Sequence, residues 1–131
     1  MGETILRQLW SFDALADPAG LADWKLRSQR IEGKLAARPG EGRPPRPVNL
    51  DPGYVTLNKL VLASTKDREQ RIYLSSGIYA EITLMRRRGK WEPFPHTFPD
   101  YAAGTYNGFL EKVRRKYKEQ LTELDPRSGG S

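Results

Sequence analysis

Apolar residues recur at steps of three and four near both ends of the chain, which is the spacing of one helix face. At the N-terminus this spacing predicts a helix over residues 3–15 and, after the helix-breaking stretch ADPAG, a second helix over residues 18–35. Asp17 is a suitable N-cap for the second helix and Pro18 a suitable first residue. At the C-terminus the spacing predicts a helix over residues 105–124, with the stripe Tyr106, Phe109, Leu110, Val113, Tyr117 and Leu121.

The middle of the chain shows the two-residue alternation that is typical of strands. Residues 71–74 (RIYL) and 78–85 (IYAEITLM) are joined by SSG, which favours a tight hairpin. In the second strand one face is expected to carry Ile78, Ala80, Ile82 and Leu84, and the other Tyr79, Glu81 and Thr83. RRRGK then predicts a turn, and WEPF a third strand that Pro93 restricts to an edge or a short run.

Residues 48–62 combine turn residues with apolar ones. VNL predicts a short strand and Asp51-Pro52-Gly53 a turn. The apolar residues of 55–62 contain steps of three and four, which fit a buried helix slightly better than a strand. Upstream, the Pro/Gly/Arg-rich residues 38–47 predict a flexible surface loop, whose arginines could contact an anion.

Together these elements predict an α+β fold, a small antiparallel sheet packed by N-terminal and C-terminal helices. We expect one domain over residues 1–124 and a disordered tail over residues 125–131.

Composition excludes several classes of protein. The 131 residues are 37% hydrophobic, without an apolar run long enough to span a bilayer and without a secretory signal, so we expect no membrane partner. Cysteine is absent, which excludes disulfides, thiolate catalysis and cysteine-ligated metals, and fits a cytoplasmic location. His96 is the sole histidine, and neither a P-loop nor a dinucleotide-binding glycine motif occurs.

The net charge of +6 favours an anionic partner such as a nucleotide or RNA, although the same charge could serve solubility alone. Basic residues cluster at 86–90 and 112–118, near aromatic residues. These clusters predict a nucleic-acid surface, and the alternative is ordinary solvated charge. The candidates are Arg86, Arg87, Arg88, Lys90 and Arg115.

Carboxylates in structured segments are candidates for catalysis. Glu81 could act as a general base or a magnesium ligand if its face lines a cleft, and is otherwise solvated. Asp51 could join it, or cap the turn that it begins. We expect Lys59, Lys66 and Asp51 to edge a polar pocket against Glu81. The candidate ligand-binding residues are Lys59, Lys66, Arg71, Tyr79 and Asp100.

Four segments resemble one uncharacterised bacterial family, the domain-of-unknown-function family 4416. They are NLDPGYVTLNKLVLASTK, RIYLSSGIYAEITL, TFPDY and VRRKYKEQL, and LWSFDALADPAGLADWKLRSQRIE resembles the stretch before them. Some members are labelled GTP-binding proteins, so the resemblance implies a nucleotide such as GTP. It brings no catalytic residues.

This chain departs from the family pattern in two ways. The pattern includes a further N-terminal portion, so we expect Met1 to correspond to its middle, leaving an exposed sheet edge through which the chain could form a homo-oligomer. The family also often carries His where Gln70 stands and Trp where His96 stands.

Three functions follow as hypotheses. The first is a non-enzymatic binding module for a phosphate-bearing ligand, a nucleotide or RNA. The second is a small enzyme that acts on a phosphorylated substrate with carboxylate acid/base or magnesium chemistry. The third is a protein-interaction domain.

Overall fold

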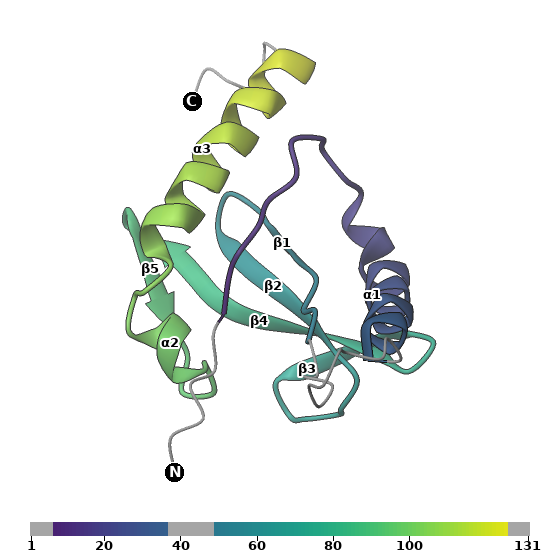
Figure 1. The fold of residues 1–131 in the computed structure, drawn as a ribbon. Coiled ribbons are helices and arrows are strands. Elements are labelled where there is room, and N and C mark those ends of the chain that lie inside the picture. Colours follow the sequence, from purple (N-terminus) through teal and green to yellow (C-terminus); the bar gives the residue numbers. More distant parts are fainter. Residues whose placement is uncertain (1–6, 37–48, 126–131) are drawn as a thin grey trace, which may run out of the picture.

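The computed structural model describes residues 7–36 and 49–125 and has the predicted α+β architecture (Figure 1). A 3-10 turn, Pro18–Gly20, leads into helix α1 (Leu21–Ala36). The strands are β1 (Gly53–Val55), β2 (Lys59–Ser64), β3 (Arg71–Ser75), β4 (Ile78–Arg87) and β5 (Lys90–Pro93). The short helix α2 (Pro99–Ala102) and the long helix α3 (Asn107–Leu124) follow. Within these residues no helix is long and apolar enough to cross a membrane.

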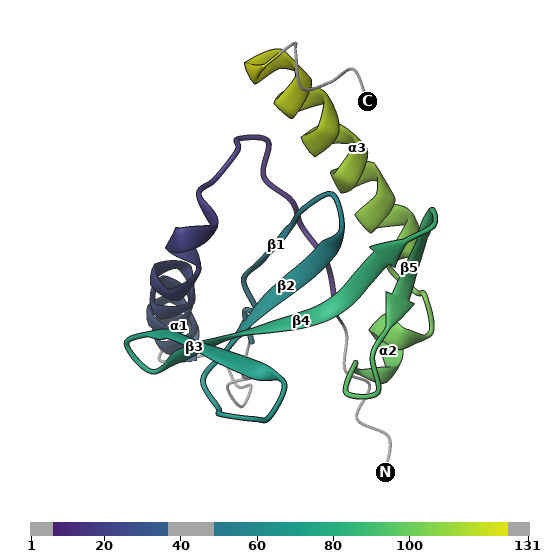
Figure 2. The same cartoon turned by 180° about the vertical axis from the view of Figure 1, so that it is seen from behind.

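The ten-residue strand β4 is the centre of an antiparallel sheet (Figure 2). The strand order is β1-β2-β4-β3, and β5 also pairs with β4. Because β2 occupies one edge of β4, β3 and β5 share the other edge, β3 beside residues 78–81 and β5 beside residues 84–87. Among the described residues, no strand pairs with the middle of β4 in the gap between β3 and β5.

Two tight turns confirm the predicted hairpins. Ser76 and Gly77 have φ angles of 54° and 77°, and Arg88 and Gly89 have φ angles of 52° and 76°. Two successive residues with positive φ match the right-handed twist of the flanking strands. Glycine adopts this backbone without steric cost, which explains its place at the second position of each turn.

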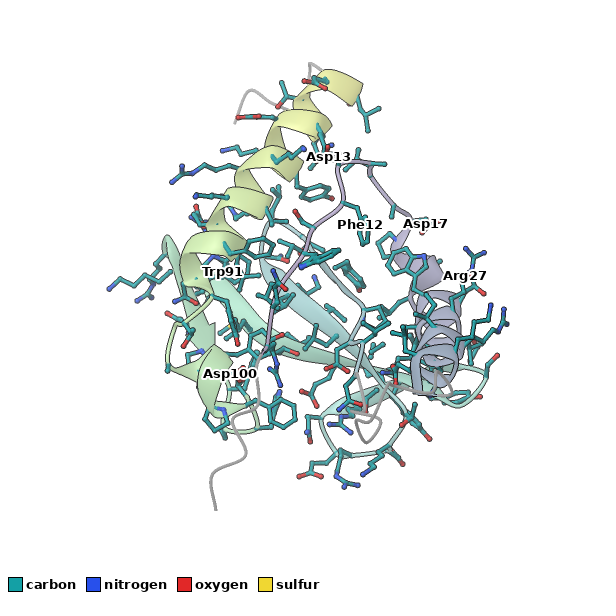
Figure 3. All side chains as sticks on the ribbon, viewed as in Figure 1. Phe12, Asp13, Asp17, Arg27, Trp91 and Asp100 are labelled. Carbon is teal, nitrogen blue, oxygen red and sulfur yellow. The ribbon has the colours of Figure 1, made fainter. Side chains whose placement is uncertain are left out.

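The described part of the first predicted helix is not helical. Residues 7–16 have no regular secondary structure and bend at residues 13–14; we call this segment the strap. Arg7 at one end forms an ion pair with Asp100, and Asp13 at the other pairs with Lys116 of α3 (Figure 3). Leu9 packs into the core between them. These contacts with residues far along the chain override the local helical spacing.

The prediction of a helix over residues 55–62 is also wrong, because these residues form β1, a turn and the first part of β2. The Thr56 N–H donates to the Lys59 carbonyl at 2.9 Å, which closes the turn. Leu60 and Val61 are both buried, although strand neighbours point to opposite faces. A strand that is buried on both faces carries apolar residues at neighbouring positions, so polar and apolar residues no longer alternate along it. This is why the spacing of apolar residues in 55–62 resembles that of a helix. Leu50 precedes β1 without being in a strand, and Val48 and the predicted loop 38–47 lie outside the described residues.

Two hydrophobic clusters hold the helices on the sheet. One joins α1 to the sheet and contains Leu21, Ala22, Val61, Ala63 and Ile78. The other joins α2 and α3 to the sheet and contains Leu60, Leu84, Trp91, Tyr101 and Leu110. Both views show α1 near the end of β4 that pairs with β3, and α3 near the end that pairs with β5.

A β-bulge interrupts β4 at Thr83. The pairing passes from Leu60 with Leu84 to Val61 with Ile82, so Thr83 is an additional residue on β4. Leu60 and Val61 point to opposite faces of the sheet. Their pairing partners on β4, Leu84 and Ile82, therefore also point to opposite faces. Leu84 is accordingly 1% exposed and Ile82 41% exposed. The prediction that Ile82 and Leu84 share a face is therefore wrong, because the bulge reverses the alternation.

Candidate functional site

Glu81 lies in a structural ion pair. The residue is 5% exposed, and its carboxylate accepts hydrogen bonds from Arg71 Nε at 2.6 Å and Gln70 Nε2 at 3.2 Å. In the sheet, Glu81 of β4 pairs with Leu62 of β2. Lys59 of β2 pairs instead with Met85, and its ammonium donates to Asn58 Oδ1 at 3.1 Å. No contact within the described residues joins Lys59 to Glu81, so the structure does not bring these two predicted residues together.

Asp51 contacts helix α1 instead of a cleft. It lies 3.5 Å from Nζ of Lys25, and the same ammonium donates to the Leu50 carbonyl at 3.2 Å. Lys25 is 9% exposed, and its ammonium therefore needs these oxygen partners. Asp51 holds the segment before β1 against α1.

Asp100 anchors the strap to α2. Its carboxylate forms an ion pair with Arg7, with Oδ2 2.9 Å from Nη1, and accepts a hydrogen bond from the Tyr106 hydroxyl at 2.8 Å. The Arg7 guanidinium lies 4.9 Å from the centre of the Tyr101 ring, and burial raises the pKa of Tyr101. Nothing in the sequence near Arg7 indicated this partner. Among the described residues, no group of three potential metal ligands lies close together.

Lys66, Arg71 and Tyr79 lie at the β3 end of the sheet. The Lys66 carbonyl accepts a hydrogen bond from Arg71 Nη1 at 3.0 Å, which closes the loop before β3. Tyr79 packs edge-on against Tyr73, with ring centres 5.3 Å apart. The Arg71 guanidinium thus bonds both to the Lys66 carbonyl and to the Glu81 carboxylate.

The first basic cluster divides into paired and unpaired cations. Arg86 donates to both carboxylate oxygens of Glu111 at 2.8 and 3.0 Å, and Trp91 Nε1 donates to the same carboxylate at 3.1 Å. The hydrogen bond from Arg86 holds the pKa of Glu111 below its ordinary value. Arg87 pairs with Glu92 at 3.2 Å.

A groove between the β4–β5 hairpin and α3 brings the two basic clusters together. This open cavity of about 530 Å³ is lined by Gly89, Lys90, Trp91, Asn107, Gly108, Glu111 and Arg115. We call it the hairpin groove. Lys90 and Arg115 are exposed, as is Arg88 at the hairpin tip. No carboxylate within the described residues forms an ion pair with any of these three cations. Asn107 also contributes a buried Oδ1 without a hydrogen-bond partner.

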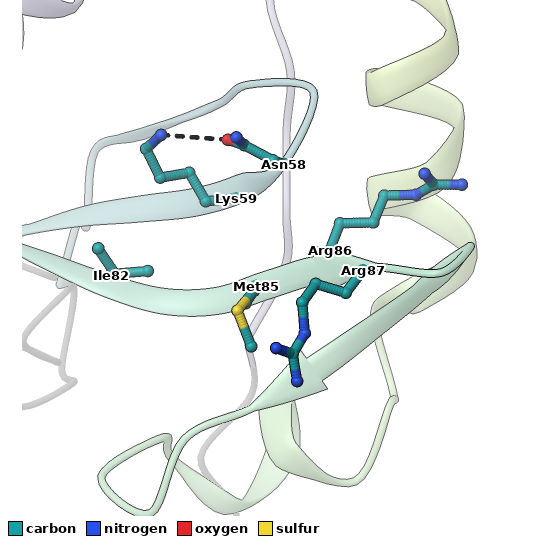
Figure 4. Close-up of a pocket in the computed structure, with 6 residues that line it drawn as sticks. All are labelled: Asn58, Lys59, Ile82, Met85, Arg86 and Arg87. Atoms are coloured by element: carbon teal, nitrogen blue, oxygen red, sulfur yellow. Dashed lines mark hydrogen bonds between the residues drawn. The ribbon is translucent and has the colours of Figure 1, made fainter.

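A second cavity lies between β2 and β4. It has a volume of about 320 Å³ and is lined by Asn58, Lys59, Ile82, Met85, Arg86 and Arg87 (Figure 4). We call it the bulge pocket. Regular alternation would put Ile82 and Met85 on opposite faces, and only the bulge places them together. Sequence analysis therefore missed Met85 and Asn58 as pocket residues, because no local signal marks the bulge.

One comparison identifies the family. The model of the family described as Domain of unknown function (DUF4416) matches residues 1–117. The chain belongs to this family. The match covers both cavities and confirms the resemblance that the segment patterns indicated. Neither the curated proteins nor the solved structures contain a significant match to the chain.

Proposed function

We propose that this DUF4416 member is a binding module for a phosphate-bearing ligand, a nucleotide or RNA, that binds in the hairpin groove. The observation that carries the proposal is the meeting of Lys90 and Arg115 across that groove. These residues come from two basic clusters that are separate in the sequence. Arg88 extends the cationic surface to the hairpin tip.

The pairing of the neighbouring cations supports this assignment. Arg86 donates to both oxygens of Glu111, so its positive charge is already compensated, whereas Arg87 forms an exposed pair with a single oxygen of Glu92. The hydrogen-bond donors of Lys90 and Arg115 have no such carboxylate among the described residues and can serve phosphate oxygens. An exposed cation pair across a groove suits a ligand that presents phosphate rather than a flat neutral surface.

Trp91 supplies little stacking surface. It is 8% exposed and its indole N–H is already bonded to Glu111. Recognition in the groove would therefore rest on phosphate contacts rather than on base stacking by this residue. Binding that depends on phosphate contacts tolerates many base sequences and weakens steeply with salt.

The test measures binding of a fluorescent single-stranded RNA by anisotropy, and of GTP by calorimetry, between about 50 mM and about 200 mM salt. The double variant Lys90→Gln/Arg115→Gln should lower the salt slope for RNA by about 1.4, since each single-strand phosphate contact contributes roughly 0.7. The matched control is Arg30→Gln/Lys34→Gln, which removes the same charge from the exposed surface of α1. Equal losses in both double variants, or no binding of either ligand, would reject the proposal.

The enzyme hypothesis has weaker support. Glu81, Asp51 and Asp100 each contact a different cation and lie in separate parts of the fold. A general base or a magnesium site needs carboxylate oxygens that are free to receive a proton or an ion. Nothing about these three residues favours catalysis over the structural contacts that they make.

The interaction hypothesis has one observation in its favour. On the edge strand β3, Ile72, Tyr73 and Leu74 are 69%, 57% and 41% exposed. Exposed apolar edge strands are prone to pair with another chain, so we propose a homo-oligomer through this edge. Light scattering at increasing protein concentration should show a dimer, and Ile72→Lys should restore the monomer mass. A constant monomer mass in the unaltered chain would exclude this mode.

A further inference from the structure

The bulge pocket exists because of a specific backbone feature. Without Thr83 as an additional residue, Met85 and Arg87 would lie on the face opposite Ile82, where α3 packs. The bulge turns these two side chains to the side of Ile82 and Lys59. It also turns Arg86 away, and Figure 4 shows the Arg86 side chain directed toward α3, away from Lys59 and Ile82. The pocket is therefore separated from the hairpin groove by the strand.

The loop after β5 holds the bulge in place. The Thr97 hydroxyl donates to the Thr83 carbonyl at 2.7 Å, and His96 Nε2 donates to the Ile82 carbonyl at 2.9 Å. These carbonyls lie in the gap between β3 and β5, where no strand reaches them. The His96 ring in turn stacks on Phe94 with ring centres 5.2 Å apart. A bulge with both carbonyls satisfied is a built feature of the fold, and such bulges often re-aim side chains beside binding sites.

The pocket combines an apolar floor with a cationic rim. Ile82 is 41% exposed although it lies mid-strand, and Met85 is half-buried beside it. Lys59 and Arg87 flank these two residues. The Lys59 ammonium has a neutral amide, Asn58, as its partner. Arg87 donates from Nε and Nη2 to a single oxygen of Glu92, which leaves donors of its guanidinium available.

We infer that the bulge pocket binds a small amphipathic anion, a phosphate-like head carried on a short hydrocarbon body. The head would contact Lys59 and Arg87, and the body would cover Ile82 and Met85. Burial of an apolar body removes from water the exposed parts of Ile82 and Met85. A simple anion would contact only the two cations and leave Ile82 and Met85 in water. An uncharged hydrocarbon would cover these two residues but form no contact with the charges of Lys59 and Arg87. The inference does not depend on the proposed function, because it concerns another face of β4.

The test uses three probes: hexyl phosphate, inorganic phosphate and hexanol. Binding is followed through the backbone amide shifts of the ¹⁵N-labelled chain. Hexyl phosphate should shift amides of residues 58–60 and 82–87 and bind at least about tenfold more tightly than phosphate or hexanol. Burial of a few methylenes suffices for the gain over phosphate, and the charge contacts of the head account for the gain over hexanol. Comparable affinity for phosphate or for hexanol, or shifts confined to other residues, would overturn the inference.

Two variants separate the head from the body. Lys59→Met removes the charge but keeps an unbranched side chain, and it should weaken hexyl phosphate binding about fivefold while leaving hexanol binding unchanged. Ile82→Thr keeps a β-branched residue in the strand and should reduce hexyl phosphate affinity toward that of phosphate. The matched controls, Lys66→Met and Ile72→Thr, change an exposed lysine and an exposed isoleucine outside the pocket. Retained affinity in both pocket variants, with spectra that show a folded chain, would refute the inference.

Discussion

Thr97→Val tests whether a single hydroxyl maintains the bulge of β4. The Thr97 side chain is 8% exposed, and its hydroxyl makes two hydrogen bonds. It donates to the Thr83 carbonyl at 2.7 Å and accepts from the Phe94 N–H at 2.8 Å. Valine has the same shape without the hydroxyl, so the substitution removes both bonds and leaves the packing volume unchanged.

The expected loss follows from the two backbone groups that would be left without partners. Each unsatisfied buried donor or acceptor costs about 1–3 kcal/mol. Thr83 is 0% exposed, whereas Phe94 is only partly buried, so the carbonyl should contribute the larger share. We expect the free energy of unfolding to fall by about 3 kcal/mol, which for a domain of this size lowers the melting temperature by about 10 °C.

Urea unfolding, followed by circular dichroism, measures the change. Thr97→Ser is the matched control because it keeps the hydroxyl and removes a methyl group, at a cost of about 1 kcal/mol. The valine variant should also shift the amides of Ile82 to Met85, because the bulge relaxes. A valine variant as stable as the unaltered chain, or a serine variant that loses as much, would show that the hydroxyl does not hold the bulge.

Three further predictions concern other parts of the fold. Glu81→Ala should lower the free energy of unfolding by about 3–5 kcal/mol, because it leaves the Arg71 guanidinium largely buried and without its carboxylate partner. Urea titration measures this change, and a loss below about 1 kcal/mol would contradict a buried pair. The pKa of Glu111 is lowered in the folded chain. Its ionised carboxylate therefore stabilises the fold fully at pH values above its ordinary pKa of 4.5, and this stabilisation is lost as the pH falls through the lower pKa of the folded chain. The difference in melting temperature between the unaltered chain and Glu111→Gln should therefore shrink on acidification, and a constant difference would refute this. Gly53→Ala should destabilise the chain because a methyl group would meet the facing β2 backbone, whereas Gly33→Ala in open space on α1 should stabilise it by about 0.5–1 kcal/mol, as thermal melts can compare.

The elements that sequence analysis predicted correctly are those with local causes. The Asp17 side chain accepts the Ala19 N–H at 2.9 Å before α1, as the capping pattern indicated. The hairpins at Gly77 and Gly89 follow from residues that tolerate positive φ. The stripe of α3 buries Leu110 as predicted. In each case the information lies within a few residues.

The partners of the candidate site residues were not predicted, because ion pairs form between residues that are far apart in the sequence. Glu81, Asp51 and Asp100 were correctly placed in structured segments, but their partners Arg71, Lys25 and Arg7 could not be read from the sequence. A carboxylate that already pairs with a cation is less available to a proton or a metal ion. Only the structure distinguishes such charges from the unpaired ones.

Caps, periodicity and turn residues act over short distances, and the sequence alone was therefore enough to predict the α+β class, helices α1 and α3, and the two hairpins. The remaining features depend on the tertiary structure. It kept the strap non-helical through contacts with α2 and α3, and it placed residues 55–62 in β1, a turn and β2, where the neighbours Leu60 and Val61 are both buried. It also inserted the Thr83 bulge and brought Lys90 to Arg115. These features depend on pairing between segments that are far apart in the chain, and the free energy of such pairing exceeds local preferences.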